Sequence, residues 1–338
     1  MPAVTDVRIE RVDPLELDLD TADALAEAMA EGHRRAGLVL PVHGGPAFLQ
    51  ARRLGSDNRP LDGLWVAWVD GTPVAHADLE LPWRENTSAA FVRGHVHPDH
   101  RRAGIGRRLW DTAVGEARGA GRARVYSGAL DGTPGGPTLE AWGLVPTDGR
   151  YAVRRIDLHA TPTTTWRRLV DECEAPAADY ELVRLAGPTP EELRPGMALL
   201  HEAINDAPAN DEDEEPMLFD EQRVRDYDDA MAARRQTVYR VLARHRTSGE
   251  WAGLSMLCVD EFGPTVAFQE DTSVVRAHRG HRLGLLMKAD MLRWITEDRP
   301  EVAAVDTWNA ITNHHMIAVN ERLGARVVAH FQGYRLDL

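Results

Sequence analysis

A repeat spaced by 178 residues constrains the fold of this chain more than any other feature. Residues 96–109 read VHPDHRRAGIGRRL, and residues 274–285 read VVRAHRGHRLGL. Aligning the two stretches places Arg279 178 positions after Arg101. This spacing is about half of a 338-residue chain, so we expect two copies of one domain.

The first copy has the pattern of a strand, a cationic glycine loop and the start of a helix. Backbone N–H groups at such a helix start point toward one place, and the helix dipole adds positive charge there. Gly104 and Gly106 allow a ligand to approach the backbone closely, because neither has a Cβ. The loop therefore predicts a phosphate or pyrophosphate site, with a solvated basic helix start as the alternative. A dinucleotide fingerprint would need a third glycine, and a P-loop would need Gly-Lys-Ser/Thr.

The segment Arg101-Arg102-Ala103-Gly104-Ile105-Gly106 resembles the Arg/Gln-x-x-Gly-x-Gly/Ala signature of the GNAT superfamily of acyl-CoA-dependent N-acyltransferases. The resemblance implies acetyl-CoA as co-substrate, with its pyrophosphate on this loop and its pantetheine arm along the preceding strand. The cofactor-binding residues implied in the first half are Val96, His97, Arg101, Arg102, Ala103, Gly104, Ile105, Gly106 and Arg107.

The second copy departs from the signature, because Arg282 stands where its first glycine belongs. This substitution adds charge but argues against a close approach of the backbone to a ligand. Downstream, Trp308-Asn309 and a later Leu323-Gly324 resemble the family's Asn-containing helix and its ending. The cofactor-binding residues implied in the second half are Val274, Val275, Arg279, Gly280, His281, Arg282, Leu283, Gly284, Leu285, Asn309 and Asn313.

The usual general acid of the family is missing from both halves. Many members carry a tyrosine four residues before the glycine that ends the helix, and it protonates the leaving thiolate. Asn320 occupies that position in the second half, and Leu139 in the first. We keep Asn320 as a candidate catalytic residue by position alone, and the tyrosine's role is not carried over to it.

The strand before the second loop offers a candidate general base, Glu270. The family often places a glutamate base on this strand, and a structural carboxylate is the alternative. Strand alternation predicts that Glu270 shares a face with Thr272 and that Asp271 points the other way. In the first half His95 could serve, although a structural histidine is the stronger interpretation. We therefore expect catalysis in the second half, while both halves hold acyl-CoA.

Hydrophobic patterning predicts an α/β chain of α+β type, with a mixed, mostly antiparallel sheet flanked by helices in each half. Asp70-Gly71 between two apolar runs predicts a β-hairpin. The stretch 131–137 reads as a loop, and 150–158 as the strand that closes the first domain. We place the N-terminal domain at 1–158, a linker with one helical turn at 159–178, and the C-terminal domain at 179–338.

The composition of the chain indicates which classes of partner and which cellular compartment to expect. The net charge of −14 repels nucleic acid and anionic membranes, so we expect neither as a partner. Two cysteines, no signal pattern and no long apolar run are typical of a cytoplasmic protein. No Cys/His cluster has zinc spacing, so we expect no metal. The oligomeric state stays open between a monomer and a homodimer.

These observations favour an N-acetyltransferase, an acyltransferase that moves an acetyl group from acetyl-CoA to a small-molecule amine. A peptide or protein N-acetyltransferase would use the same loop. A non-catalytic acyl-CoA-binding module is the third hypothesis, because neither half has the family's tyrosine.

Overall fold

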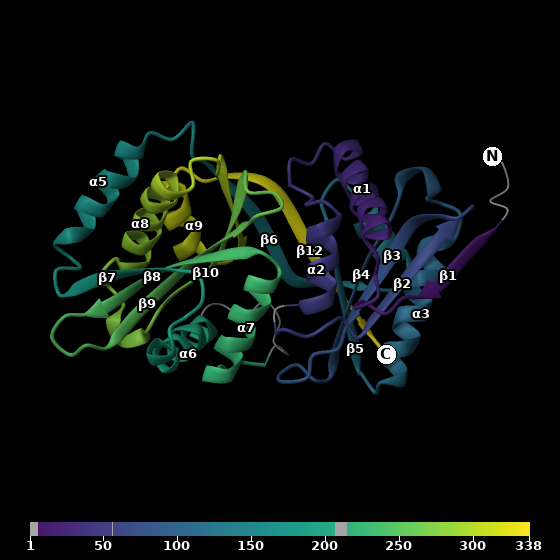
Figure 1. Ribbon diagram of the computed structural model, residues 1–338, viewed down its shortest axis with the longest axis horizontal. Coiled ribbons are helices and arrows are strands. Elements are labelled where there is room, and N and C mark those ends of the chain that lie inside the picture. The colour runs from purple at the N-terminus through teal and green to yellow at the C-terminus, as the bar shows by residue number, and fades with distance from the viewer. Residues whose placement is uncertain (1–5, 56, 207–214) are drawn as a thin grey trace. The chain divides into compact units, whose positions relative to one another are not determined.

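The computed structural model describes residues 6–55, 57–206 and 215–338, which form two compact units (Figure 1). Among these, unit 1 contains residues 6–150, Glu215 and 329–338, and unit 2 contains 151–206 and 216–328. Both units have helices on a mixed, mostly antiparallel sheet, which confirms the predicted fold class.

The described part of unit 1 has a sheet in which only β4 and β5 run parallel, while the other neighbouring strands are antiparallel. The hairpin expected at Asp70-Gly71 is confirmed, and both residues have positive φ, at 49° and 80°, as a type I′ turn requires. The strand order across the sheet is β1 (Val7–Arg11), β2 (Gly63–Val69), β3 (Thr72–Glu80), β4 (Ala89–Val96), β5 (Arg124–Leu130) and β12 (Arg326–Asp337).

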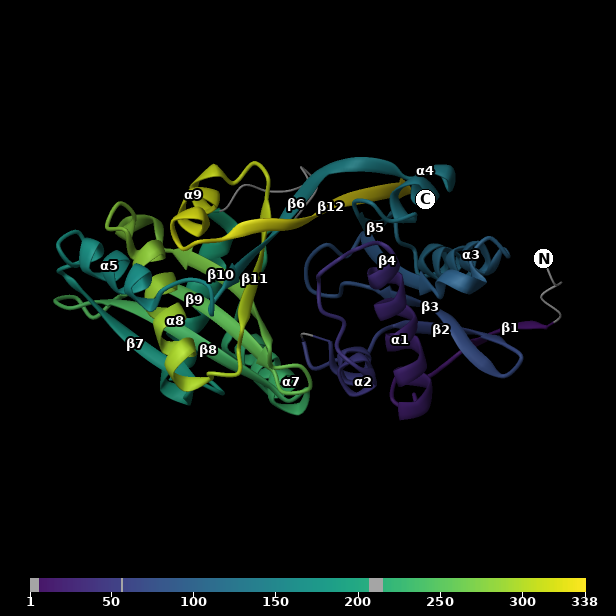
Figure 2. The same ribbon diagram turned by 90° about the horizontal axis from the view of Figure 1, so that it is seen from above.

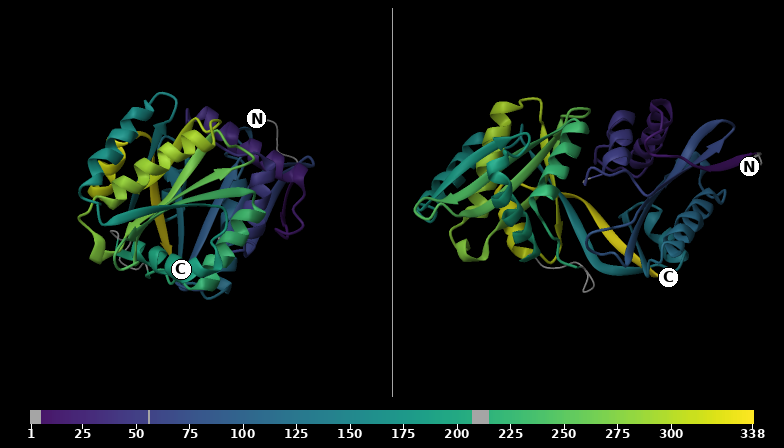
Figure 3. Two further views of the ribbon diagram at one scale, coloured as in Figure 1. Left: turned by 60° about the vertical axis from the view of Figure 1, so that its left-hand side comes forward. Right: turned by 60° about the horizontal axis from the view of Figure 1, so that its bottom comes forward.

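Helices cover both faces of the unit 1 sheet (Figure 3). Strand alternation sends Leu64 and Val66 into one core with α1 and α2, while Trp65 and Ala67 face the other core with α3. A short helix, α4, begins at Gly135, inside the stretch that we had expected to be loop. The bounds are α1 (Leu19–Arg35), α2 (Gly45–Leu54), α3 (Ile105–Gly119) and α4 (Gly135–Ala141), with the 3-10 turn η1 (Pro98–His100) before α3.

Unit 2 repeats this plan, with β10 and β11 as its parallel pair. Its order is β7 (Tyr180–Ala186), β8 (Gln236–His245), β9 (Trp251–Asp260), β10 (Val266–Val274), β11 (Ala304–Ala310) and β6 (Val145–Asp157). Figure 1 shows α6 and α7 on one face and α5 and α8 on the other. The helices are α5 (Thr163–Glu174), α6 (Arg194–Glu202), α7 (Glu221–Ala233), α8 (Leu283–Asp298) and α9 (His314–Arg322), with the turns η2 (Glu191–Leu193), η3 (Ala203–Asp206) and η4 (Arg276–His278).

Each unit takes one strand from the other half of the chain (Figure 2). Residues 151–157 of β6 pair with β11 in unit 2, although we had expected them to close the first domain. Residues 331–337 of β12 pair with β5 in unit 1. The expected linker also contains a full helix, α5, whose Trp166 is buried and donates through Nε1 to the carbonyl of Leu323.

Candidate functional site

The parallel strand pair in each unit separates partway along its length. The register of β4 with β5 runs from Ala89 to Phe91, and that of β10 with β11 runs from Val266 to Gln269. Beyond these residues the described parts of the two strands in each pair are no longer hydrogen-bonded to each other. Backbone N–H and C=O groups along the remaining part of β4 or β10 can therefore bind an extended ligand instead of a strand.

The loop of unit 1 turns from β4 into α3 in the way the sequence predicts. The Nε of Arg101 donates to the carbonyl of Val96 over 3.0 Å and closes the loop onto the strand end. Arg102 and Gly104 have positive φ, at 65° and 81°, and α3 begins at Ile105. Successive N–H groups in such a turn form an anion-binding concavity at a helix N-terminus.

The loop of unit 2 has the same backbone with its residue types exchanged. Arg279 donates through Nε to the carbonyl of Val274 over 3.1 Å. Positive φ now falls on Gly280, at 91°, and on Arg282, at 56°. Thus Arg282 keeps the left-handed conformation of its counterpart Gly104, so the altered signature does not change the path of the chain.

The predicted cofactor-binding residues divide by what their side chains do. Ile105, Leu283 and Leu285 are buried in the cores, so only their backbone can face a ligand. Arg107 binds Asp111 over 2.8 Å on the surface of α3. The remaining predicted residues lie at the ends of β4 and β10, in the loops or at the helix starts, and their contact with a cofactor stays a prediction: Val96, His97, Arg101, Arg102, Ala103, Gly104 and Gly106 in unit 1, and Val274, Val275, Arg279, Gly280, Arg282 and Gly284 in unit 2.

Three polar residues named from the sequence have contacts within the chain. The Nδ1 of His281 lies 3.1 Å from the carbonyl of Pro176. Asn313 caps α9 by accepting from the backbone N–H of Met316 over 3.1 Å. The side chain of Asn309 joins a separate contact with the α9 residue Asn320.

Asn320 is fully buried, and its Nδ2 donates to Oδ1 of Asn309 over 2.6 Å. Its Oδ1 has no hydrogen-bond partner among the described residues. A carboxamide does not titrate in the physiological range, so this contact ties α9 to β11 and supplies no proton.

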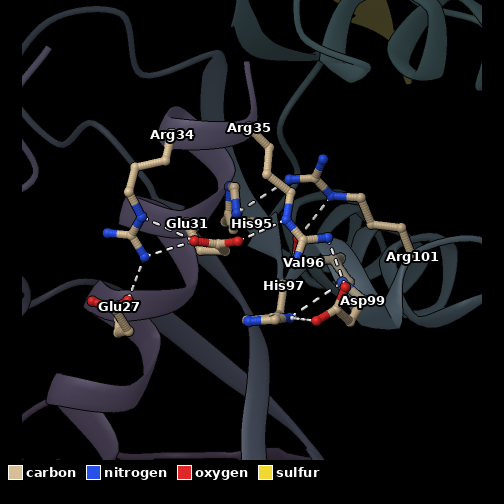
Figure 4. A network of polar contacts seen from close by, with 9 residues as sticks. All are labelled: Glu27, Glu31, Arg34, Arg35, His95, Val96, His97, Asp99 and Arg101. Carbon is tan, nitrogen blue, oxygen red and sulfur yellow. Dashed lines mark hydrogen bonds and ion pairs between the residues drawn. The ribbon is translucent and has the colours of Figure 1, made fainter. Parts of the chain in front are cut away.

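A network of charged residues ties α1 to the loop of unit 1 (Figure 4). Arg35 binds the loop residue Asp99 over 2.6 Å and the helix residue Glu31 over 2.7 Å. Nη2 of Arg101 lies 3.4 Å from Nε2 of His95. An arginine only donates, so His95 accepts here and its proton is on Nδ1.

His95 is therefore held as a neutral ring beneath Arg101. Burial foremost, together with the nearby His76 and Arg101, lowers the pKa of His95 to about 3. A Cβ on Gly32 of α1 would lie 2.4 Å from its Cε1, so the ring fits closely under that helix. This geometry favours the structural interpretation of His95 over a role as general base.

The strand before the second loop contains a β-bulge, which changes which side chains share a face. The register of β10 with β9 shifts between Gln269 and Thr272. Thr272 contacts Ser255, whereas Glu270 hydrogen-bonds with Cys258, and residues 255 and 258 lie on opposite faces of β9. The expectation that Glu270 and Thr272 share a face was wrong, because the bulge interrupts the alternation.

Glu270 lies on the face covered by α6 and α7, in a group that sequence reasoning missed. Burial, with a smaller effect of the adjacent Asp271, raises the pKa of Glu270 to about 7. Burial also raises the pKa of Asp271. The Tyr227 hydroxyl of α7 lies 3.6 Å from Sγ of Cys258, and burial raises the pKa of both groups far above their ordinary values. No motif surrounds Tyr227 or Cys258, so only their positions opposite β10 reveal them.

A carboxylate that titrates near pH 7 beside a separated strand pair can accept a proton from an amine. Among the described residues no cluster of His, Cys, Asp or Glu could hold a metal ion. Within the same ranges, no helix has the length and apolarity needed to cross a membrane.

Comparisons with known proteins agree with this geometry. Residues 28–132 match the model of the Acetyltransferase (GNAT) family. The solved structure of a tandem GNAT protein from the clavulanic acid biosynthesis pathway is similar over 98% of both chains, with a TM-score of 0.81 and 26% identity. Residues 28–132 thus carry the GNAT domain, and the chain as a whole is similar to a tandem GNAT protein.

A GCN5-related N-acetyltransferase from Sphaerobacter thermophilus also shares the fold of this chain. The similarity covers 98% of this chain and 95% of the other, with a TM-score of 0.67 and 18% identity. No curated protein sequence matches the chain closely enough to count as a relative.

Proposed function

We propose that this protein transfers an acetyl group from acetyl-CoA to the amine of a small molecule, and that unit 2 carries out the transfer. The observation that carries the proposal is Glu270, a carboxyl group with a pKa of about 7 where β10 leaves β11. The splayed strands and the glycine loop around it belong to a fold that supports acyl transfer in general.

A base is needed because the acceptor is protonated before it reacts. An alkyl amine has an ordinary pKa near 10.4, so removing its proton at neutral pH costs roughly 4–5 kcal/mol. Glu270, when ionised, takes the proton that the attacking nitrogen must lose. The nitrogen forms its bond to the acetyl carbon, and the thiolate of CoA leaves and takes up a proton from the site.

The acceptor side of unit 2 suits a cationic amine. The Glu270 and Asp271 carboxyls stand together on the bulge, and burial favours their neutral forms. A bound ammonium group would favour their ionised forms and lower both pKa values. The similar tandem protein belongs to a pathway that makes a small molecule, which supports a small acceptor over a peptide.

The proposal is tested by measuring CoA release with acetyl-CoA and a panel of small amines, for the wild type, Glu270→Gln and Asp271→Asn. We expect Glu270→Gln to lower kcat/KM by roughly 100-fold or more, with the affinity for acetyl-CoA unchanged. Asp271→Asn is the matched control and should have a much smaller effect.

Two other results would replace the proposal by one of its alternatives. Turnover with peptides but not with small amines would favour a peptide N-acetyltransferase. Binding of acetyl-CoA without turnover on any amine would favour a binding module.

A further inference from the structure

The two loops are fastened to the helices beside them by ion pairs of opposite polarity. In unit 1 the helix supplies the cation and the loop supplies the anion, as Arg35 of α1 binds Asp99. In unit 2 the loop supplies the cations, because Arg276 and Arg279 both bind Asp206 of η3. The turn η3 continues directly from α6.

Because of this difference, the first arginine of the signature is ion-paired in unit 2 (Arg279) and has no carboxylate partner among the described residues in unit 1 (Arg101). Nη2 of Arg279 donates to Oδ2 of Asp206 over 2.6 Å, and Arg276 reaches the other carboxylate oxygen over 3.4 Å. In unit 1 the corresponding Nη2 of Arg101 faces the neutral His95. No described carboxylate lies within ion-pair distance of Arg101, so its charge stays available to an anion.

Two guanidinium groups that converge on the two oxygens of one carboxylate form the arrangement with which arginines also bind a phosphate. Both loops have the same backbone turn, and both signature arginines are anchored through Nε to the last carbonyl of the strand. The distinguishing feature of unit 2 is therefore the anion already bound there.

We propose that Asp206 is an internal anion that competes with the pyrophosphate of acyl-CoA for Arg276 and Arg279 in unit 2. This inference rests on the proposed function, because it takes acyl-CoA to be a ligand of unit 2. It assigns a role to a residue outside the signature, and it predicts that unit 1 binds acyl-CoA more tightly than unit 2.

A ligand can displace Asp206 from the two arginines, because the ion pair is partly exposed to solvent. The side chains of Asp206 and Arg279 are 32% and 42% exposed, and that of Arg276 is 81% exposed. Ion pairs of this kind contribute little to stability. A pyrophosphate brings more negative charge than one carboxylate, together with contacts to the N–H groups of the loop, so it can displace Asp206.

Displacement would also loosen the acceptor side of unit 2. The Oγ of Ser273, on β10, donates to the carbonyl of Leu200 over 2.7 Å and fixes α6 to the strand. Asp206 adds a second attachment, one turn beyond the end of α6. When acyl-CoA removes that second attachment, η3 keeps its connection only through α6, and its amides become less protected.

The experiment measures acetyl-CoA affinity by calorimetry in chains whose unit 1 loop is blocked by Gly106→Trp. That background is compared with the same chain carrying Asp206→Asn or Asp206→Glu. We expect Asp206→Asn to tighten binding about three- to tenfold, because the competing charge is lost, whereas Asp206→Glu keeps the charge and stays within about twofold. Each variant is first checked for folding by circular dichroism and thermal melting.

A second readout does not depend on affinity. In the Gly106→Trp background, acetyl-CoA should speed hydrogen exchange of the η3 amides, 203–206, and the Asp206→Asn chain should show that faster exchange before acetyl-CoA is added.

The possible results separate the two proposals. If the Gly106→Trp chain binds acetyl-CoA and Asp206→Asn leaves the affinity unchanged or weakens it, competition by Asp206 is wrong while the proposed function stands. If neither the Gly106→Trp chain nor its Asp206→Asn derivative binds acetyl-CoA, unit 2 is not an acyl-CoA site, and both proposals are overturned. Asp99→Asn in a Gly284→Trp background controls for the loss of a charge beside a loop, and it should change affinity less than Asp206→Asn does.

Discussion

The glycine loops of unit 1 and unit 2 adopt the same backbone turn with different residues at the same positions. In unit 1 the left-handed positions are held by Arg102 and Gly104, and in unit 2 by Gly280 and Arg282. The path of the chain is preserved, but the arginine side chain moves from the first left-handed position to the second. Conformation is thus repeated between the units, while the placement of charge is not.

The same contrast holds for the face that would receive the acceptor. In unit 1, β4 has a continuous register with β3 and places His95 under α1. In unit 2, Glu270 lies on the face covered by α6 and α7, and the bulge in β10 moves Thr272 to the opposite face. The two faces therefore differ in the groups that they carry: a packed neutral histidine in unit 1, and a carboxyl group with a raised pKa in unit 2.

The largest expected effect concerns the buried ion pair beneath the acceptor side of unit 2. Arg240 is fully buried on β8, and it pairs with Asp228 of α7. Asp228→Ala leaves this guanidinium without its counter-charge, so we expect a loss of about 3–5 kcal/mol in the free energy of unfolding. Chemical denaturation measures this, and the exposed control Asp229→Ala, on the same helix, should stay within about 0.5 kcal/mol.

A smaller but still large effect is expected from blocking one loop at a time. Gly106 and Gly284 are equivalent, and neither has positive φ, so a tryptophan is tolerated by the backbone. We expect Gly284→Trp to lower kcat by roughly 100-fold or more, whereas Gly106→Trp keeps most of the turnover and loses the tighter acetyl-CoA site. The reverse pattern, measured by steady-state kinetics and calorimetry, would place the transfer in unit 1.

The pH dependence of the reaction gives an intermediate effect. Because the pKa of Glu270 is raised to about 7, the ionised base is lost as the pH falls below that value. We expect kcat/KM to fall about tenfold per pH unit below pH 7 and to level off above it. In Glu270→Gln this limb should disappear, and a limb that survives the substitution would assign the titration to another group.

The smallest effect tests the exchange of residue types in the loops. Gly104 has a φ of 81°, so Gly104→Ala should cost about 1 kcal/mol of stability. Gly284 lies in the first turn of α8, where the nearest atom to an added Cβ is 4.0 Å away. Gly284→Ala should therefore stabilise the chain by up to about 1 kcal/mol. Thermal melting compares the two, and equal signs would show that the loops do not differ as described.

The repeat in the sequence predicted much of this structure, because its information is local. Both loops, the hairpin at Asp70-Gly71 and the helices after each loop follow from short patterns of glycine, charge and apolar residues. The equivalence of the two copies extends to the position of each left-handed residue, although the residue types differ.

The rest depends on contacts between distant residues. The bulge in β10 is set by pairing with β9, so alternation alone placed Thr272 on the wrong face. Asp206 lies beyond the end of α6, and nothing in its neighbourhood signals that it meets two arginines more than 60 positions away. The partners of β6 and β12 are likewise decided by pairings that span about half the chain or more.

That exchange of strands affects the order in which the chain can fold as it is made. The sheet of unit 1 gains β12 only when residues 331–337 have been synthesised and have left the ribosome. Until then β5 presents an open edge, which is a site for pairing with other chains. Although its sequence comes first, unit 1 is completed last, so the nascent chain must wait with an unfinished sheet while all of unit 2 is translated.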